Sequence, residues 1–224
     1  MQSASGLYRS SVGKKVVMAT SGLVLFAFVV GHMIGNLKVY QGPERFDAYA
    51  RYLREVGSPL LGHGELLWIV RAVLLLCVAL HVVAAVQLTL RCRAARHGRY
   101  ARREDLSFSY ASHTMRWGGV LLVAFVAYHL LHLTAGTLHP DFGDSPYHNV
   151  VAAFRVWWVA AAYAGAVGVL GLHVYHGLWS ATQTLGLGDP RLTRWRRPAA
   201  GVLATAIVAG YLLVPFGVLA GLVR

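Results

Sequence analysis

The sequence predicts an all-α integral membrane protein, built as a bundle of five transmembrane helices. Two compositional observations support this: 56% of the 224 residues are hydrophobic and only 13% are charged, about half of the charged share usual in a soluble domain. A third observation is that apolar runs of about 20 residues, long enough to cross a bilayer, recur along the chain. A chain of this composition cannot bury its apolar surface in one soluble core, so we expect the membrane to cover it.

The five predicted spans use most of the length, so we expect residues 1–224 to form a single membrane domain. The first span follows Lys14 and Lys15, as the core of a signal peptide would. It is longer than such a core and lacks a small-residue cleavage pattern, so we expect it to be retained. The spans are expected at about 16–37, 66–90, 117–138, 156–182 and 199–222.

The positive charge is concentrated on one predicted side of the membrane. The formal net charge is +12, from 21 Lys and Arg against 9 Asp and Glu. Basic residues gather before the first span and in segments 91–103 and 191–197, whereas segments 38–65 and 139–155 mix both signs. This bias predicts a cytoplasmic N-terminus and an external C-terminus. Because topology accounts for the charge, no nucleic-acid partner is expected.

Two connections and two cysteines complete the organisation. Residues 46–56 place apolar side chains at helical intervals, which predicts an amphipathic helix capping the outer end of the bundle. Residues 137–149 are rich in turn formers, so we expect them to be irregular.

Cys77 and Cys92 are the only cysteines, one within a span and one at its edge, so we expect no disulfide. The absence of C-x-x-C-H excludes covalent c-type haem attachment by that motif.

Histidines occur within four of the five spans, where ionisable groups are costly and usually face a partner or a cofactor. A single buried histidine is equally well explained by a hydrogen bond across a helix interface. Four helices that each contribute at least one favour a shared binding role. These residues are His32; His81; His129 and His132; His173 and His176.

Depth sorts these histidines into two pairs. At a rise of about 1.5 Å per residue, His32 and His129 lie roughly 20–25 Å from the cytoplasmic edge, and His81 and His173 lie roughly 15 Å from it. We therefore predict a deep pair, His32 with His129, and a shallow pair, His81 with His173. The deep pair lies on the two histidine-bearing spans that run outward, and the shallow pair lies on the two that run back.

This arrangement predicts two b-type haems, each held by two axial histidines. A six-coordinate haem iron needs its axial nitrogens on opposite porphyrin faces, and two histidines three residues apart share one helix face. Each doublet, 129/132 and 173/176, should therefore supply one ligand. Zinc is the competing metal, but it prefers a compact tetrahedral set that often includes cysteine or carboxylate, and no acidic residue lies within the spans.

The histidine-bearing segments resemble a known family. SGLVLFAFVVGHMIGNL (21–37), FVAYHLLHLT (125–134) and LHVYHGLWSATQ (172–183), together with a lone His81, resemble the dihaem cytochrome b membrane anchor of bacterial succinate dehydrogenases and fumarate reductases. The resemblance covers nearly the whole chain. It implies that His81 and His173 bind the proximal haem and His32 and His129 the distal haem. Of the 173/176 doublet, the resemblance selects His173 as the ligand, because it stands four residues before Gly-Leu-Trp. The roles of His132 and His176 stay open.

The resemblance also implies a function. Such an anchor passes electrons from an iron–sulfur subunit through its two haems to a membrane quinone, usually menaquinone. Succinate oxidation, a step of the tricarboxylic acid cycle, takes place on a flavoprotein subunit. Both partners would dock on the cytoplasmic side of the bacterial cytoplasmic (inner) membrane. This chain has no dinucleotide-binding glycine motif and no ferredoxin cysteine set, as expected if flavin and clusters belong to those partners.

Three further residues and two alternative functions follow from the sequence. Three residues, Lys38, His63 and Glu65, lie near the outer face. They have two interpretations: groups that exchange protons with a quinone, or solvated loop residues.

The first alternative function is the dihaem anchor of another quinone-linked enzyme, such as a hydrogenase or a formate dehydrogenase. The second is a haem-free transporter lined by histidines, which would be colourless.

Overall fold

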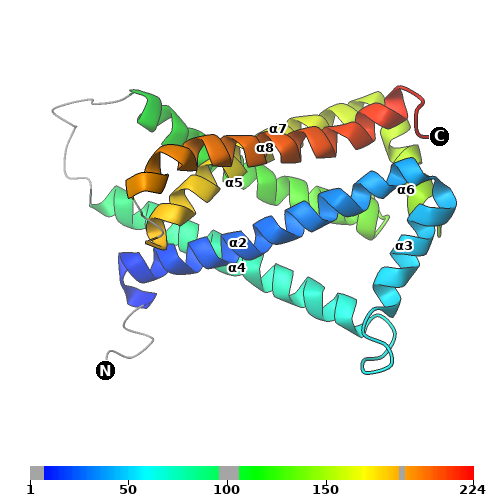
Figure 1. Ribbon diagram of the computed structural model, residues 1–224, viewed down its shortest axis with the longest axis horizontal. Coiled ribbons are helices and arrows are strands. Elements are labelled where there is room, and N and C mark those ends of the chain that lie inside the picture. The colour runs from blue at the N-terminus through cyan, green and yellow to red at the C-terminus, as the bar shows by residue number, and fades with distance from the viewer. Residues whose placement is uncertain (1–7, 96–105, 187–189) are drawn as a thin grey trace.

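The computed structural model describes residues 8–95, 106–186 and 190–224, and among them it contains helices and no strand. Five of the helices are long and apolar enough to cross a membrane, which confirms the predicted fold class. The start of α2 and the C-terminus lie at opposite ends of the bundle, as an odd number of crossings requires (Figure 1). The five are α2 (Ser11–Leu37), α4 (Glu65–Ala94), α5 (Leu106–His129), α7 (Trp157–Thr184) and α8 (Pro190–Leu219).

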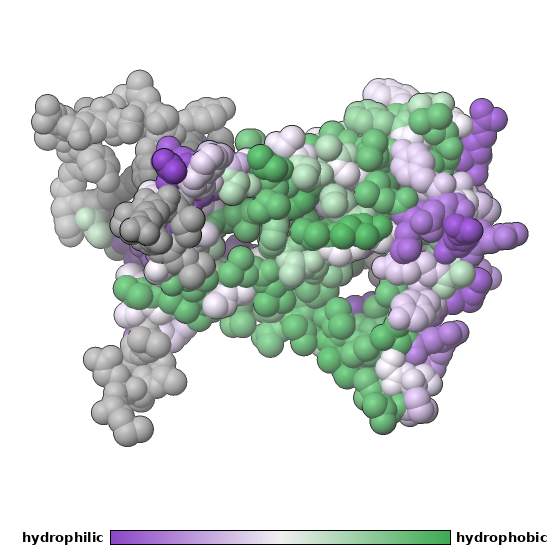
Figure 2. Space-filling model, in the orientation of Figure 1, coloured by the Kyte–Doolittle hydropathy of each residue, from purple (hydrophilic) through white to green (hydrophobic). Residues whose placement is uncertain are grey.

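Helices α2 and α7 lie at the centre of the bundle. Helix α2 packs against α4, α7 and α8, while α7 packs against α5 and α8. Ala84 is the only buried residue of α4, so most of that helix presents apolar side chains outward. Figure 2 shows the result as a broad apolar band next to a polar end. A bilayer is the solvent that suits such a surface.

Local capping decides where the helices begin and end. Helix α2 starts at Ser11, earlier than predicted, because the Ser10 side chain accepts a hydrogen bond of 2.9 Å from the Gly13 N–H. The third span was expected to reach residue 138, but α5 ends at His129 and continues as a π-helical segment, η2 (Leu130–Thr134). Beyond it, Gly136 has a φ of 73°, a left-handed conformation that no helix continues through.

The basic segment 191–197, which lies between the fourth and fifth predicted spans, belongs to the first turns of α8. Pro190 opens this helix, where its fixed φ is already helical and its missing N–H costs nothing. The expected end at 222 is also wrong, since α8 stops at Leu219 before Gly221, whose φ is 71°. The remainder of the other basic segment, residues 96–103, lies outside the described residues.

Two short helices cap the polar end of the bundle (Figure 1). The predicted amphipathic helix is present as α3 (Pro43–Glu55), which follows the short η1 (Lys38–Gln41). The expectation of an irregular 137–149 segment is wrong from Pro146 onward, where α6 (Pro146–Arg155) begins. Ser145 caps this helix by accepting from the His148 N–H at 3.1 Å.

Asp47 of α3 explains why α6 forms. One carboxylate oxygen accepts from the Tyr147 N–H at 2.9 Å, and the other accepts from the Ser145 hydroxyl at 2.6 Å. A carboxylate at a helix N-terminus satisfies otherwise unpaired N–H groups and complements the helix dipole. This partner lies about a hundred residues away in the sequence, so no local pattern predicts the contact that it adds to the local Ser145 cap.

Replacing Asp47 by alanine should loosen this cap. The change leaves the Tyr147 N–H and the Ser145 hydroxyl without their acceptor, at a cost of about 1–3 kcal/mol. We expect faster amide hydrogen exchange in residues 145–149, measured by mass spectrometry on the full chain. The control is Glu44→Ala, which removes an exposed carboxylate in the first turn of α3. Equal exchange in both variants would show that the cap forms without Asp47.

Candidate functional site

The shallow histidine pair lies between α4 and α7. The ring centroids of His81 and His173 are 6.1 Å apart, with an angle of 61° between the ring planes. His81 Nδ1 lies 3.0 Å from the Met18 carbonyl of α2, so this nitrogen donates its proton there. The other nitrogen, Nε2, is then unprotonated. An imidazole that donates one N–H to a carbonyl and offers the other nitrogen is the usual form of a metal-binding histidine.

Glycines let the helices approach these rings. A Cβ added at Gly22 of α2 would lie 3.1 Å from His81 Cε1, which is tighter than normal packing allows. A Cβ added at Gly119 of α5 would lie 4.0 Å from His173 Cε1. A side chain at Gly22 would therefore require the His81 ring or its helix to shift by a few tenths of an ångström.

His173 combines burial with an unsatisfied polar atom. In the part of the chain that the structure describes, its Nδ1 is buried and has no hydrogen-bond partner. An imidazole nitrogen in apolar surroundings is costly when nothing bonds to it. A cavity of about 200 Å³ adjoins the ring; it is lined by Met115, Trp117, Gly118, Leu121, Val169, Leu172 and His173.

The deep pair lies between α2 and α5. The ring centroids of His32 and His129 are 5.9 Å apart, and the ring planes are 76° from parallel. Aromatic rings hold both imidazoles in place: Phe28 stacks on His32 at 5.3 Å, and Phe125 stacks on His129 at 6.1 Å. The Tyr211 ring of α8 lies 6.2 Å from His32. All five spanning helices therefore contribute to one of the two pairs or to its surroundings.

The two remaining histidines of the spans lie outside the pairs. His132 is buried, and its Nδ1 lies 3.0 Å from the Tyr163 hydroxyl. His176 Nδ1 donates to the Leu172 carbonyl of its own helix at 3.2 Å. The structure thus brings together the four histidines predicted as ligands, in the predicted pairs, and gives each leftover member of a doublet a different hydrogen-bond partner.

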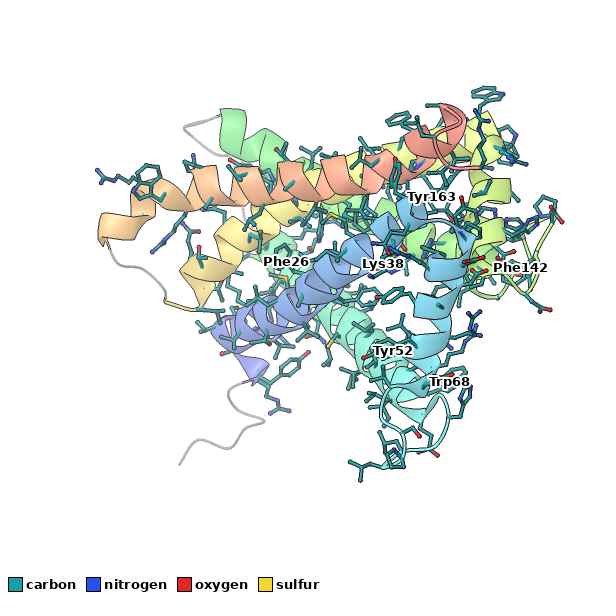
Figure 3. All side chains as sticks on the ribbon, turned by 45° about the vertical axis from the view of Figure 1, so that its right-hand side comes forward. Phe26, Lys38, Tyr52, Trp68, Phe142 and Tyr163 are labelled. Carbon is teal, nitrogen blue, oxygen red and sulfur yellow. The ribbon has the colours of Figure 1, made fainter. Side chains whose placement is uncertain are left out.

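Tyr163 is the residue that the sequence analysis missed. Its hydroxyl lies 3.4 Å from His129 Nδ1 as well as 3.0 Å from His132 Nδ1. Tyrosine is common within apolar helices near the membrane surface, so its position in the sequence carries no signal. The packing of α7 against α5 brings its ring within 5.9 Å of both His129 and His132, centroid to centroid. Tyr163 is labelled in Figure 3.

The role of Lys38, His63 and Glu65 in proton exchange with a quinone stays a prediction. Lys38 Nζ lies 5.1 Å from the centroid of the Tyr49 ring, a cation–π contact at the start of η1. Glu65 opens α4, and His63 is exposed in the connection before it. Arg71, which the sequence analysis did not single out, lies on α4 with its guanidinium 4.8 Å from the Trp68 ring centroid.

The geometry of the pairs suits a metal held by two imidazoles in trans. With metal–nitrogen bonds of about 2 Å, two such rings have centroids about 6 Å apart. Both pairs have this separation. Among the described residues, no group of three or more His, Cys, Asp or Glu side chains is placed to hold a metal ion. The described residues therefore form no tetrahedral zinc set, whereas the two ring separations match those of a group bound by two imidazoles.

Comparison with known proteins adds no relative. The chain matches no family model, and no curated protein or solved structure matches it.

Proposed function

We propose that this chain is the membrane-anchor cytochrome b subunit of a succinate:quinone oxidoreductase. It would pass electrons from an iron–sulfur subunit through two bis-histidine haems to a membrane quinone. The observation that carries the proposal is the meeting of four imidazoles from four helices as two pairs, with ring centroids 6.1 Å and 5.9 Å apart. In this role the chain belongs to an enzyme but does not itself bind succinate.

The residues that would hold the two haem b groups are His81 with His173, and His32 with His129. When bound, each haem supplies a one-electron carrier within the membrane. The chain's own part is to orient the imidazoles: the Met18 carbonyl would hold His81, and the Tyr163 hydroxyl would hold His129. Hydrogen bonds of this kind orient axial ligands and tune the potential of the metal they bind.

The histidine pairs favour a redox anchor over the haem-free transporter. A conduction path needs histidines along a polar channel, whereas these pairs are enclosed by aromatic rings and apolar helices. The assignment to succinate, rather than to hydrogen or formate, is supported by the resemblance in residues 21–37, 125–134 and 172–183. The basic N-terminal end and the positive-inside bias support a bacterial cytoplasmic membrane with the flavoprotein and iron–sulfur subunits on the inner side.

Optical and magnetic spectra of the purified protein test the haem assignment. We expect two low-spin b-type haems per chain in the difference between dithionite-reduced and oxidised absorption spectra. In the ferric state the electron paramagnetic resonance signals should be strongly anisotropic. The reason is that imidazole planes at 76° and 61° interact with different iron d orbitals, which brings those orbitals close in energy. A colourless protein would refute the proposal.

The choice of electron donor is tested separately in membranes that contain the native complex. Succinate, formate and hydrogen are supplied in turn, and reduction of the b-type absorbance is followed. We expect succinate alone to reduce the haems. Reduction by formate or hydrogen instead would support a dihaem anchor but show that its partner enzyme is a formate dehydrogenase or a hydrogenase.

A further inference from the structure

A groove with a volume of about 300 Å³ lies between α2, α7 and α8. It is at the end of the bundle where α2 and α8 begin and α7 ends (Figure 1). Small side chains leave this space open: Ala181 of α7 and Ala200 of α8 both line it, and they are 8% and 4% exposed. The groove contains no histidine and shares no lining residue with the cavity beside His173, so it is separate from both histidine pairs.

The groove is apolar at its inner end and basic at its outer end. Leu23 and Leu203 line the part that lies deeper in the bundle, whereas Trp195 and Arg196 line the part near the start of α8. From residue 195 to residue 203, α8 rises about 12 Å. A phospholipid shows the same order of chemistry along its length, with a charged headgroup at the membrane surface and an acyl chain directed inward.

Two tryptophans place the outer end of the groove at the membrane surface. Trp195 lines the groove and is 59% exposed, and tryptophan rings concentrate at the level of the lipid headgroups. The Arg194 guanidinium lies 5.6 Å from the centroid of the Trp195 ring, and the Arg197 guanidinium lies 4.4 Å from that of Trp179. A guanidinium above a ring keeps its N–H groups in its own plane, from which they can donate to an anion.

The charge on the walls of the groove is of one sign. Arg194, Arg196 and Arg197 follow one another closely on α8, and the sequences of α2, α7 and α8 contain no aspartate or glutamate. Basic pockets between transmembrane helices favour anionic headgroups. A zwitterionic headgroup would bring its own positive charge next to the arginines, and a neutral occupant would gain nothing from them.

We propose that the groove between α2, α7 and α8 binds one anionic phospholipid of the surrounding bilayer. Its phosphate accepts hydrogen bonds from Arg196 and the neighbouring arginines of α8, and one acyl chain lies along Ala200 toward Leu203. The lipid thereby fills the space between the start of α8 and the two helices beside it. This inference goes beyond the proposed function and does not depend on haem or quinone.

Lipid binding to the purified full chain in detergent micelles, followed by native mass spectrometry, tests the proposal. Phosphatidylglycerol is the anionic probe, and phosphatidylcholine with the same acyl chains is the zwitterionic one. We expect one phosphatidylglycerol per chain to be retained under washing that removes phosphatidylcholine. Glycerol 3-phosphate has the anionic group without acyl chains, so a large excess of it should not displace the lipid.

The variant Arg196→Gln tests the headgroup contact. It should weaken phosphatidylglycerol binding about fivefold, the usual contribution of one arginine beside anionic lipid. The matched control is Arg93→Gln, which removes the same charge from an exposed position near the end of α4 and outside the groove. Binding to this control should equal binding to the wild type.

The variant Ala199→Phe tests the site of the acyl chain. Ala199 lines the groove but is exposed, so a phenylalanine there occupies the groove rather than the packing between helices. We expect retention of phosphatidylglycerol to be lost. The matched control is Ala206→Phe, which adds the same ring at an exposed position of α8 outside the groove and should leave binding unchanged.

Several results would overturn the proposal. Equal retention of the two phospholipids by the wild type, or release of the bound lipid by glycerol 3-phosphate, would exclude a site for an anionic phospholipid. Equal weakening in Arg196→Gln and Arg93→Gln would show a general attraction to the basic end, and full binding in Ala199→Phe would place the lipid elsewhere. A quinone retained at one per chain, in place of the phospholipid, would assign the groove to the quinone.

The two arginine variants decide the question even if Ala199→Phe fails to fold, because both change only side chains at the end of the bundle. The haem content of the wild type is measured in a separate spectrum. Failure of the lipid site therefore leaves the proposed function standing, and a protein without haem leaves the lipid site standing.

Discussion

Replacing His173 by alanine should remove one of two haems and leave the other in place. His173 pairs with His81 alone, and its separation from that ring is what a trans pair requires. The deep pair draws its imidazoles from α2 and α5, which the change does not touch. We therefore expect about half of the b-type absorbance to be lost, with the remaining signal keeping its bis-histidine character.

The same logic gives the complementary variants. His81→Ala should produce the same spectrum as His173→Ala, and combining the two should cause no further loss. His32→Ala should remove the other half and leave the first. The spectra are measured on purified protein at equal chain concentration, and the control His176→Ala should keep both haems. Equal, partial loss of both signals in every variant would contradict the assignment of pairs.

Replacing Gly171 by leucine should destabilise the bundle strongly. Gly171 is buried on α7 where α8 crosses it, and a Cβ there would overlap the Val208 side chain. Helices in a membrane associate through close backbone approach at small residues, and an inserted side chain separates them. Overpacking of this kind costs about 1–3 kcal/mol, and more where the neighbouring residue cannot move.

The matched control lies on the same helix. Gly165→Leu adds the same side chain where no atom lies within 4 Å of an added Cβ. Unfolding in mixed micelles of mild detergent and dodecyl sulfate, followed by circular dichroism, compares the two variants with the wild type. We expect Gly171→Leu to unfold at a lower dodecyl sulfate fraction and Gly165→Leu to match the wild type. Equal midpoints for the two variants would show that the α7–α8 contact does not depend on a glycine.

The sequence by itself determined the membrane class, the five spans and the candidate ligands. These follow from composition and from one-dimensional spacing, because a bilayer imposes a fixed length on every apolar helix. Depth alone was sufficient to pair His32 with His129 and His81 with His173, since helices crossing the same bilayer share one depth axis. The amphipathic α3 was also predictable, because its apolar positions recur at helical intervals.

Tertiary structure decided the rest. Helix α6 receives a second cap from a carboxylate of α3, and α5 changes to a π-helical turn before Gly136; neither the distant contact nor the π-helical turn could be predicted from the local sequence. Tyr163 meets His129 and His132 only because α7 packs on α5 in one rotational setting. Spacing along a helix fixes how deep a side chain lies, whereas only packing between helices fixes which way it points.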